Sequence, residues 1–200
     1  NSSGKAKIYR LDWTESQPLD VDLGTLDYRL IQEDGLTYVS LRSFVSGTYD
    51  NMLARYAREG AKARGSKAVI YDLRGNVGGS DSWPRKWIQS FLGTQNSIET
   101  SMLYAQKNSE SLLPEDEGTC FAREVHGTWY ENDIPIIVLV DDHCGSSGEG
   151  AVQLLKTLDN VLIVGSNTAG YQLCGNISTF TLPYTGIGVR FGSTLFLYGN

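Results

Sequence analysis

The sequence has no long hydrophobic run, and this absence excludes a helical membrane span. The longest apolar stretch covers residues 134–140 and is interrupted by Pro135. A helix needs roughly 18 to 20 apolar residues to cross a bilayer, so this stretch has the length of a buried strand instead. We therefore expect no membrane span in the chain.

Basic residues are fewer than acidic ones, which argues against two further classes of partner. Lys and Arg number 17 against 23 Asp and Glu, for a net charge of −6. Nucleic-acid binding needs a clustered excess of cations to neutralise phosphates, and a polybasic membrane anchor also needs one. We expect neither nucleic acid nor an anionic lipid surface as the main partner.

Cysteine and histidine are scarce, which limits metal and disulfide chemistry. The three cysteines are Cys120, Cys144 and Cys174. No two of them have the close spacing of a zinc site, and three thiols cannot all pair with one another. We expect buried free thiols with at most one disulfide, no metal ion and no cofactor.

The rest of the composition is that of an ordinary globular protein. The chain has 200 residues, of which 40% are hydrophobic and 20% charged. This length suffices for one substantial domain and is too short for two. No signal peptide precedes Asn1, and we interpret the chain as a fragment or a mature form.

Hydrophobic periodicity predicts an alternation of strands and helices. Apolar runs predict three buried strands, at 68–73, 134–140 and 161–164. Helical periodicity predicts three helices, at 49–64, 82–91 and 147–158. The first of the strands is expected to be buried on both faces. Strand and helix in succession imply right-handed crossovers and a largely parallel sheet, so the predicted fold class is α/β.

The remaining segments predict more peripheral elements. Short apolar or alternating segments predict four further strands, at 6–11, 28–31, 36–41 and 98–105. A turn at 33–35 joins the second and third of these. Residues 108–131 are polar and predict an irregular surface excursion. From residue 177 onward, alternation and frequent turn residues predict a β-hairpin or β-meander that closes the chain.

Two glycine-rich turns follow buried strands, and each leads into a helix. Residues 72–79 read Asp-Leu-Arg-Gly-Asn-Val-Gly-Gly, and residues 143–149 read His-Cys-Gly-Ser-Ser-Gly-Glu. Ligands of parallel α/β sheets bind where such turns leave the carboxyl ends of the strands. Glycines let backbone N–H groups from both turns form an oxyanion hole, and a serine at a helix start lies at the positive end of the helix dipole.

Each turn also has an interpretation without catalysis. Ser146 and Glu149 fit the capping-box pattern Ser-x-x-Glu, which stabilises a helix start and needs no reaction. The paired glycines can simply end a strand, and Asp72 and Arg74 can form a structural ion pair. Neither turn matches the Walker or the Gly-x-Gly-x-x-Gly phosphate-binding pattern.

Four segments, in this order, resemble the tail-specific (C-terminal processing) family of serine peptidases. Residues 36–44, LTYVSLRSF, are similar to the family's strand Gly-Tyr-Ile-Arg-Ile-x-x-Phe. Residues 67–79, KAVIYDLRGNVGG, resemble its signature Asp-Leu-Arg-x-Asn-x-Gly-Gly. Residues 134–149, IPIIVLVDDHCGSSGE, resemble its nucleophile segment Val-Leu-Val-x-x-x-Ser-Ala-Ser-x-Glu. Residues 161–170, VLIVGSNTAG, resemble the Val-Gly-Glu-x-Thr-x-Gly that follows.

The resemblance implies a ClpP/crotonase-like core with flanking helices and a C-terminal β-meander. It implies that Ser146 is the nucleophile of a serine endopeptidase that hydrolyses polypeptides through an acyl-enzyme. The oxyanion donors would be the backbone N–H groups of Ser147 and of Gly78 or Gly79. It also implies an extracytoplasmic setting, in a bacterial envelope or secreted. Residues 1–200 would form a single peptidase core of a longer protein.

The sequence departs from the family at the general base. Many members carry a catalytic lysine where this sequence has Tyr171, and a tyrosine of pKa about 10 is a poor base at neutral pH. The turn around Ser146 is closer to the tricorn-protease branch, in which a histidine and a glutamate from other segments assist the serine. His143 is a further candidate, although a loop histidine more often has a solvation or capping role. We expect the base to come from outside these 200 residues.

Two rival functions stay open from the sequence alone. A non-catalytic relative would keep the fold and bind peptides or apolar ligands. Tyr171 favours that interpretation, whereas the retained Ser146 and the paired glycines oppose it. A crotonase-type acyl-thioester enzyme would share the oxyanion hole, but it needs no serine at position 146. No PDZ domain is recognisable, and the oligomeric state stays open.

Overall fold

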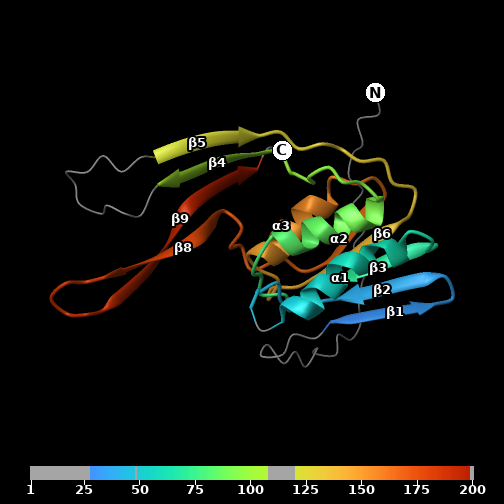
Figure 1. Ribbon diagram of the computed structural model, residues 1–200, viewed down its shortest axis with the longest axis horizontal. Coiled ribbons are helices and arrows are strands. Elements are labelled where there is room, and N and C mark those ends of the chain that lie inside the picture. Colours follow the sequence, from blue (N-terminus) through green and yellow to red (C-terminus); the bar gives the residue numbers. More distant parts are fainter. Residues whose placement is uncertain (1–27, 48, 108–119, 199–200) are drawn as a thin grey trace.

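The computed structural model describes residues 28–47, 49–107 and 120–198, which form two sheets and three helices (Figure 1). In chain order the elements are β1 (Arg29–Glu33), β2 (Leu36–Ser40), α1 (Asp50–Ala63), β3 (Ala68–Asp72), α2 (Ser82–Leu92), β4 (Met102–Lys107), β5 (Cys120–Val125), β6 (Ile136–Val140), α3 (Ser147–Leu155), β7 (Val161–Gly165), β8 (Cys174–Thr181) and β9 (Gly188–Tyr198). The strand predicted at 6–11 lies outside the described residues.

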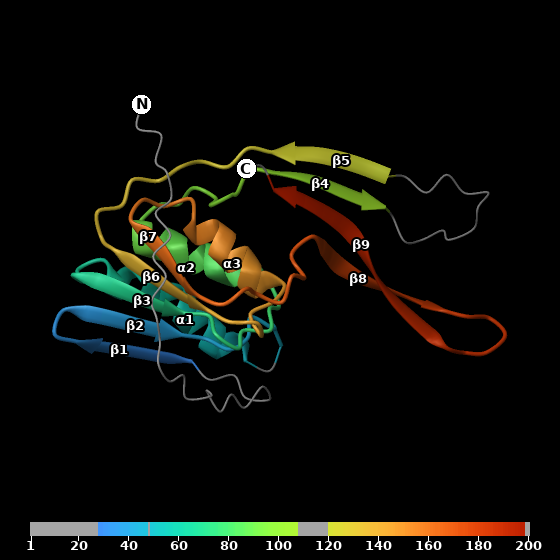
Figure 2. The same cartoon turned by 180° about the vertical axis from the view of Figure 1, so that it is seen from behind.

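The larger sheet has five strands in the order β1-β2-β3-β6-β7. β1 is antiparallel to β2, and the other neighbouring pairs are parallel. Helices α1, α2 and α3 lie together against one face of this sheet, as the two opposite views show (Figures 1 and 2). The predicted α/β fold, with a largely parallel sheet and flanking helices, is confirmed.

The hydrophobic core lies between that face and the helices. Val69 and Tyr71 of β3 are buried there, together with Val138 of β6. Ile70 and Ile137, which alternate with them, are only half-buried on the opposite face. The prediction that 68–73 is buried on both faces was therefore wrong, because none of the described helices covers the second face.

β7 is an edge strand rather than a third buried strand. It pairs with β6 alone among the described strands, and the exposed fractions of Leu162 and Ile163 are 42% and 39%. An apolar run of five residues has the same composition at an edge and in the centre of a sheet, so its position depends on the tertiary fold.

The contact between α1 and α2 is close because α1 carries a glycine there. A Cβ atom at Gly60 would lie 2.2 Å from the backbone oxygen of Trp87 and 2.9 Å from the backbone nitrogen of Phe91. Trp87 and Phe91 are themselves buried, and their rings stack at a centroid distance of 5.4 Å. α2 ends at Gly93, whose φ of 73° gives the left-handed cap that a helix end favours.

The smaller sheet is antiparallel, in the order β5-β4-β9-β8, and it corrects two predictions. The strand expected at 98–105 runs from Met102 to Lys107, and the region 108–131, expected to be irregular, contains β5. β5 forms because it pairs with β4 over its whole length, and this pairing with another segment is not visible in a short stretch inside a largely polar region. β8 and β9 form the expected closing hairpin.

Smaller differences concern a helix end and the cysteines. α3 ends at Leu155, although the predicted helix extended to 158; a turn follows, and Leu158 forms a β-bridge with Tyr130. Cys144 is free and buried as expected, whereas Cys174 is free and exposed, which contradicts the prediction of buried thiols. Among the described residues, no helix is long and apolar enough to span a membrane.

Candidate active site

The two glycine-rich turns lie side by side because β3 and β6 are parallel neighbours. The carboxyl ends of both strands therefore meet at one edge of the sheet. The backbone N–H of Gly145 donates to the carbonyl oxygen of Asn76 at 2.9 Å, and the Ser147 hydroxyl donates to the carbonyl oxygen of Gly79 at 2.8 Å. These two hydrogen bonds join the turns into a single unit.

Ser146 has a strained backbone at the point where the second turn enters α3. Its φ of 53° and ψ of −122° are those of the first central residue of a type II′ turn, a position that glycine favours. The turn is closed by the Gly148 N–H, which donates to the Gly145 carbonyl oxygen at 2.9 Å. A side chain held at positive φ costs about 1 to 3 kcal/mol and is found most often at functional sites.

Gly78 lies against Ser146 and leaves the start of α3 open. A Cβ atom at Gly78 would be 2.7 Å from Cβ of Ser146 and 2.9 Å from the backbone nitrogen of Ser147. The first N–H groups of a helix have no partner within that helix. The absence of a side chain at 78 therefore keeps the Ser147 N–H accessible from the side of Ser146.

The N–H group of Gly78 already has a partner within the first turn. It donates to the Asn76 side-chain oxygen at 2.9 Å, while the Asn76 amide donates to the carbonyl oxygen of Leu41 at 2.7 Å. Asn76 is fully buried, and its two side-chain hydrogen bonds fix the conformation of the first turn. Gly79, with a φ of 138°, packs so closely on the backbone of Phe44 that no side chain fits there.

Glu149 connects the nucleophile turn with the loop that follows β7. Its Oε2 accepts the Ser146 N–H at 3.0 Å, which is one half of the predicted capping box. Its Oε1 accepts the Thr168 hydroxyl at 2.7 Å and the Gly170 N–H at 2.8 Å. Sequence reasoning identified only the cap, although the Thr-x-Gly pattern at 168–170 was a signal for the second contact.

Asp72 anchors the first turn through buried charge. The ion pair with Arg74, 2.9 Å between Nη2 and Oδ2, is present, and Arg42 and the Tyr38 hydroxyl contact the same carboxylate. Burial by itself raises the pKa of Asp72, but the hydrogen bonds from Arg74, Tyr38 and Arg42 outweigh it and hold that pKa at about 2. The sequence did not reveal these contacts, because Tyr38 lies in β2 and Arg42 just after it, 30 or more residues before Asp72.

The two further candidates, His143 and Tyr171, are not brought to the Ser146 side chain as bases. His143 is exposed, and its Nδ1 lies 2.8 Å from Oδ1 of Asp142. Tyr171 is 67% exposed, and its ring lies beside Gly145. In the part of the chain that the structure describes, no hydrogen bond joins Ser146 to a histidine, lysine or tyrosine side chain.

One group of described residues has the composition of a metal site. The ligand atoms of Asp141, Asp142 and His143 lie within 4.8 Å of one another. The Asp141 carboxylate already accepts the N–H groups of Gly75 at 2.8 Å and of His143 at 3.2 Å. These bonds shape the turn between β6 and α3, so the cluster has a structural role without an ion.

The sequence matches the model of peptidase family S41 over residues 35–195, most of the chain. The chain belongs to peptidase family S41. Both joined turns lie within the matched residues. No curated protein sequence matches it.

Solved structures share the S41 fold. A protein from Parabacteroides merdae described as a peptidase is 26% identical, with a TM-score of 0.55, and the match covers 88% of this chain and 55% of that one. A lipoprotein from Streptococcus agalactiae is 20% identical (TM-score 0.53, 86% and 61% covered). The photosystem II D1 C-terminal processing protease is 22% identical (TM-score 0.51, 80% and 37% covered). The chain thus spans between about a third and two thirds of the length of these structures.

Proposed function

We propose that this S41 core hydrolyses peptide bonds, with Ser146 as the nucleophile. The observation that carries the proposal is the strained backbone of Ser146, held at a φ of 53° against Gly78 at the start of α3. A capping role alone requires no positive φ, because helix caps normally adopt extended backbone geometry. Membership of a peptidase family supports a polypeptide as the substrate.

The arrangement accounts for each step of acyl transfer except proton removal. The Ser146 hydroxyl oxygen attacks the peptide carbonyl carbon, and the Ser147 N–H and that of Gly78 or Gly79 stabilise the resulting oxyanion. The base takes the hydroxyl proton and delivers it to the departing amine, and water then hydrolyses the ester on Ser146 to a carboxylic acid and the free hydroxyl. In this scheme the Gly78 N–H exchanges its Asn76 acceptor for the oxyanion, or Gly79 donates instead.

The general base is proposed to come from a longer parent protein. Tyr171 stands where many family members have lysine, and among the described residues no base is hydrogen-bonded to Ser146. Residues 1–200 would then form one peptidase core domain, without a PDZ domain. The resemblance also supports an extracytoplasmic setting, and one structural neighbour is a lipoprotein.

A fluorophosphonate probe tests for an activated serine. We expect a single adduct, located by peptide mass spectrometry on Ser146, in the longer parent protein. The adduct should disappear in Ser146→Ala and persist in Ser166→Ala, which removes an exposed loop hydroxyl. If the probe labelled neither the 200-residue chain nor the longer parent protein, the proposal would be overturned.

A non-catalytic peptide-binding relative is the second candidate, and Tyr171 is the observation that favours it. Its exposed ring lies beside Gly145, where many family members carry the lysine base. This function predicts peptide binding with no adduct on Ser146 in any form of the protein, so the same labelling experiment separates the two.

A further inference from the structure

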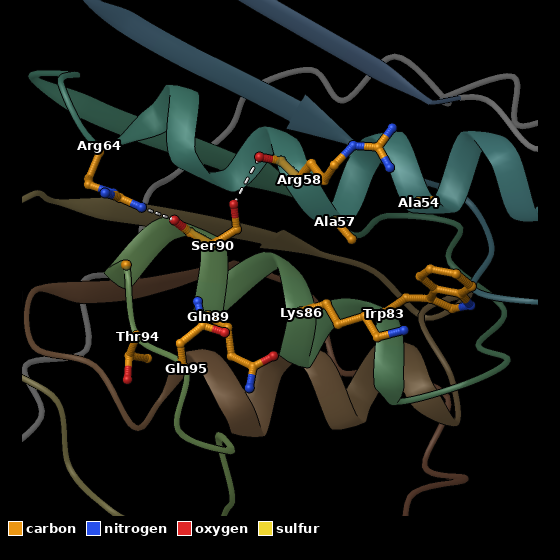
Figure 3. Close-up of a pocket in the computed structure, with 11 residues that line it drawn as sticks. Ala54, Ala57, Arg58, Arg64, Trp83, Lys86, Gln89, Ser90, Thr94 and Gln95 are labelled. Carbon is orange, nitrogen blue, oxygen red and sulfur yellow. Dashed lines mark hydrogen bonds between the residues drawn. The ribbon is translucent and has the colours of Figure 1, made fainter.

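A groove of about 660 Å³ lies between α1 and α2 (Figure 3). Ala54 and Ala57 of α1 contribute only methyl groups to it, which leaves room between the helices. Trp83 stands at one end, and Arg64 and Thr94 stand at the other (Figure 3).

The charge of the groove is opposite to that of the whole chain. Arg58, Arg64 and Lys86 line it, no acidic residue does, and yet the net charge of the chain is −6. Within the described part of the chain, neither Arg58 nor Lys86 forms an ion pair. Arg64 donates to the backbone carbonyl oxygens of Ser90 and Phe91, which fixes its guanidinium without neutralising it.

Other cations of the same two helices are neutralised. Arg55 and Lys62 both contact Glu59, at 3.2 and 2.6 Å, and Arg85 forms an ion pair with Glu99. Unpaired positive charge on this surface is thus concentrated in the groove, where it would attract an anionic ligand.

The remaining lining suits a peptide better than a nucleic acid. Lys86 Nζ lies 4.6 Å from the centre of the Trp83 ring, and that ring is held by a 2.9 Å hydrogen bond from its Nε1 to the Ser46 hydroxyl. Gln89 and Gln95 add amide groups that can bond to a peptide backbone. An acidic peptide can also place uncharged residues against these amides and the Trp83 ring, whereas a nucleic acid carries a phosphate at every unit.

The groove begins close to the candidate active site. α2 starts three residues after Gly79, which accepts the Ser147 hydroxyl, and Asp81 lies against Gly150 of α3. The 11 residues of α2 extend for about 16 Å. An extended segment of about five residues therefore spans the groove.

We propose that this groove is a second binding site, which holds an acidic segment of a polypeptide substrate. Carboxylates of the segment pair with Arg58 and Lys86, and an apolar side chain packs on Trp83. That the bound segment belongs to a substrate rests on the proposed peptidase function. Binding of an acidic peptide in the groove does not depend on that function, so the experiment measures binding without cleavage.

The test measures binding of a fluorescein-labelled hexaglutamate peptide to the full chain carrying Ser146→Ala, by fluorescence anisotropy. Ser146→Ala prevents cleavage, so the measurement holds whether or not Ser146 is a nucleophile. We expect the double variant Arg58→Gln/Lys86→Gln to weaken binding about tenfold, because two ion pairs are lost. Binding should also weaken as salt is raised.

A matched control removes the same charge elsewhere. Lys156→Gln/Arg190→Gln deletes two exposed cations outside the groove and should leave the affinity within about twofold. Equal weakening in both double variants would assign the effect to net charge and overturn the proposal. Equal binding of a hexaglutamine peptide, or tighter binding of a single-stranded RNA of the same charge, would also overturn it.

Discussion

Gly78 and Ser146 approach each other so closely that a methyl group on Gly78 would lie 2.7 Å from Cβ of Ser146. Real Cβ atoms are not found at that distance from another carbon, so one of the two turns would have to move. This contact between the two turns is the geometric centre of the candidate site.

In the longer parent protein, where labelling is expected, Gly78→Ala should therefore abolish labelling of Ser146 by a fluorophosphonate. It should also lower the free energy of unfolding by at least about 2 kcal/mol, because φ at 78 is 94°. Gly47→Ala is the matched control, since φ there is 122° and nothing lies within 4 Å of the added carbon. Gly47→Ala should cost about 1 kcal/mol and leave labelling intact. Equal labelling in both variants would contradict the proposed geometry.

Glu149→Gln is expected to disconnect the loop after β7 from the nucleophile turn. The carboxylate accepts three hydrogen bonds, and a neutral amide has only one oxygen to replace its two. We expect chemical denaturation to show a free energy of unfolding lower by about 3 kcal/mol, and the fluorophosphonate to label Ser146 more slowly. Thr168→Val, which removes one of the three bonds, should have an intermediate effect. Glu131→Gln, at an exposed position, should have none.

Asp72 should make the protein acid-labile in a defined pH range. Its pKa falls from 3.8 to about 2 in the folded chain, so the unfolded chain binds the proton first as the pH is lowered. The stabilisation is complete above pH about 4 and is lost as the pH falls towards 2, by about 2 kcal/mol. Chemical denaturation at several pH values should show the free energy of unfolding falling over this range, and Asp72→Asn should remove that dependence on pH. Asp133→Asn, at an exposed position, is the control. If Asp72→Asn kept the same pH dependence of stability as this control, the dependence would not come from Asp72.

The two described free thiols should react very differently. Burial, followed by the nearby carboxylates of Glu149 and Asp141, raises the pKa of the Cys144 thiol to about 12, whereas Cys174 is exposed. Iodoacetamide at pH 8 should modify Cys174 in the native protein and spare Cys144 until the chain is unfolded. Peptide mapping by mass spectrometry measures both sites at once. Comparable rates at the two sites would show that Cys144 is accessible.

Much of the candidate site could be predicted because its signals are local. The Ser-x-x-Glu cap, the Asp72–Arg74 pair and the glycines of both turns all lie within a few residues of one another in the sequence. Apolar periodicity also placed α1, α2 and the central strands, since burial of one face requires a regular pattern.

Contacts between distant segments escaped sequence reasoning. Glu149 reaches Gly170, 21 residues away, and Arg42 reaches Asp72, 30 residues away. β5 was missed because it is short, lies within a largely polar region and is stabilised by pairing with β4. The burial of each strand depended equally on its neighbours, as the exposed edge position of β7 shows.

Periodicity and short motifs were enough to predict the α/β class, the order of the helices and of the strands of the larger sheet, and the positions of the two turns. The packing of distant segments decided that all three helices lie on one face, that Ser146 is held at positive φ against Gly78, and that a basic groove lies between α1 and α2. Each of these depends on which distant segments pack together, and packing is fixed by the whole chain rather than by any one segment.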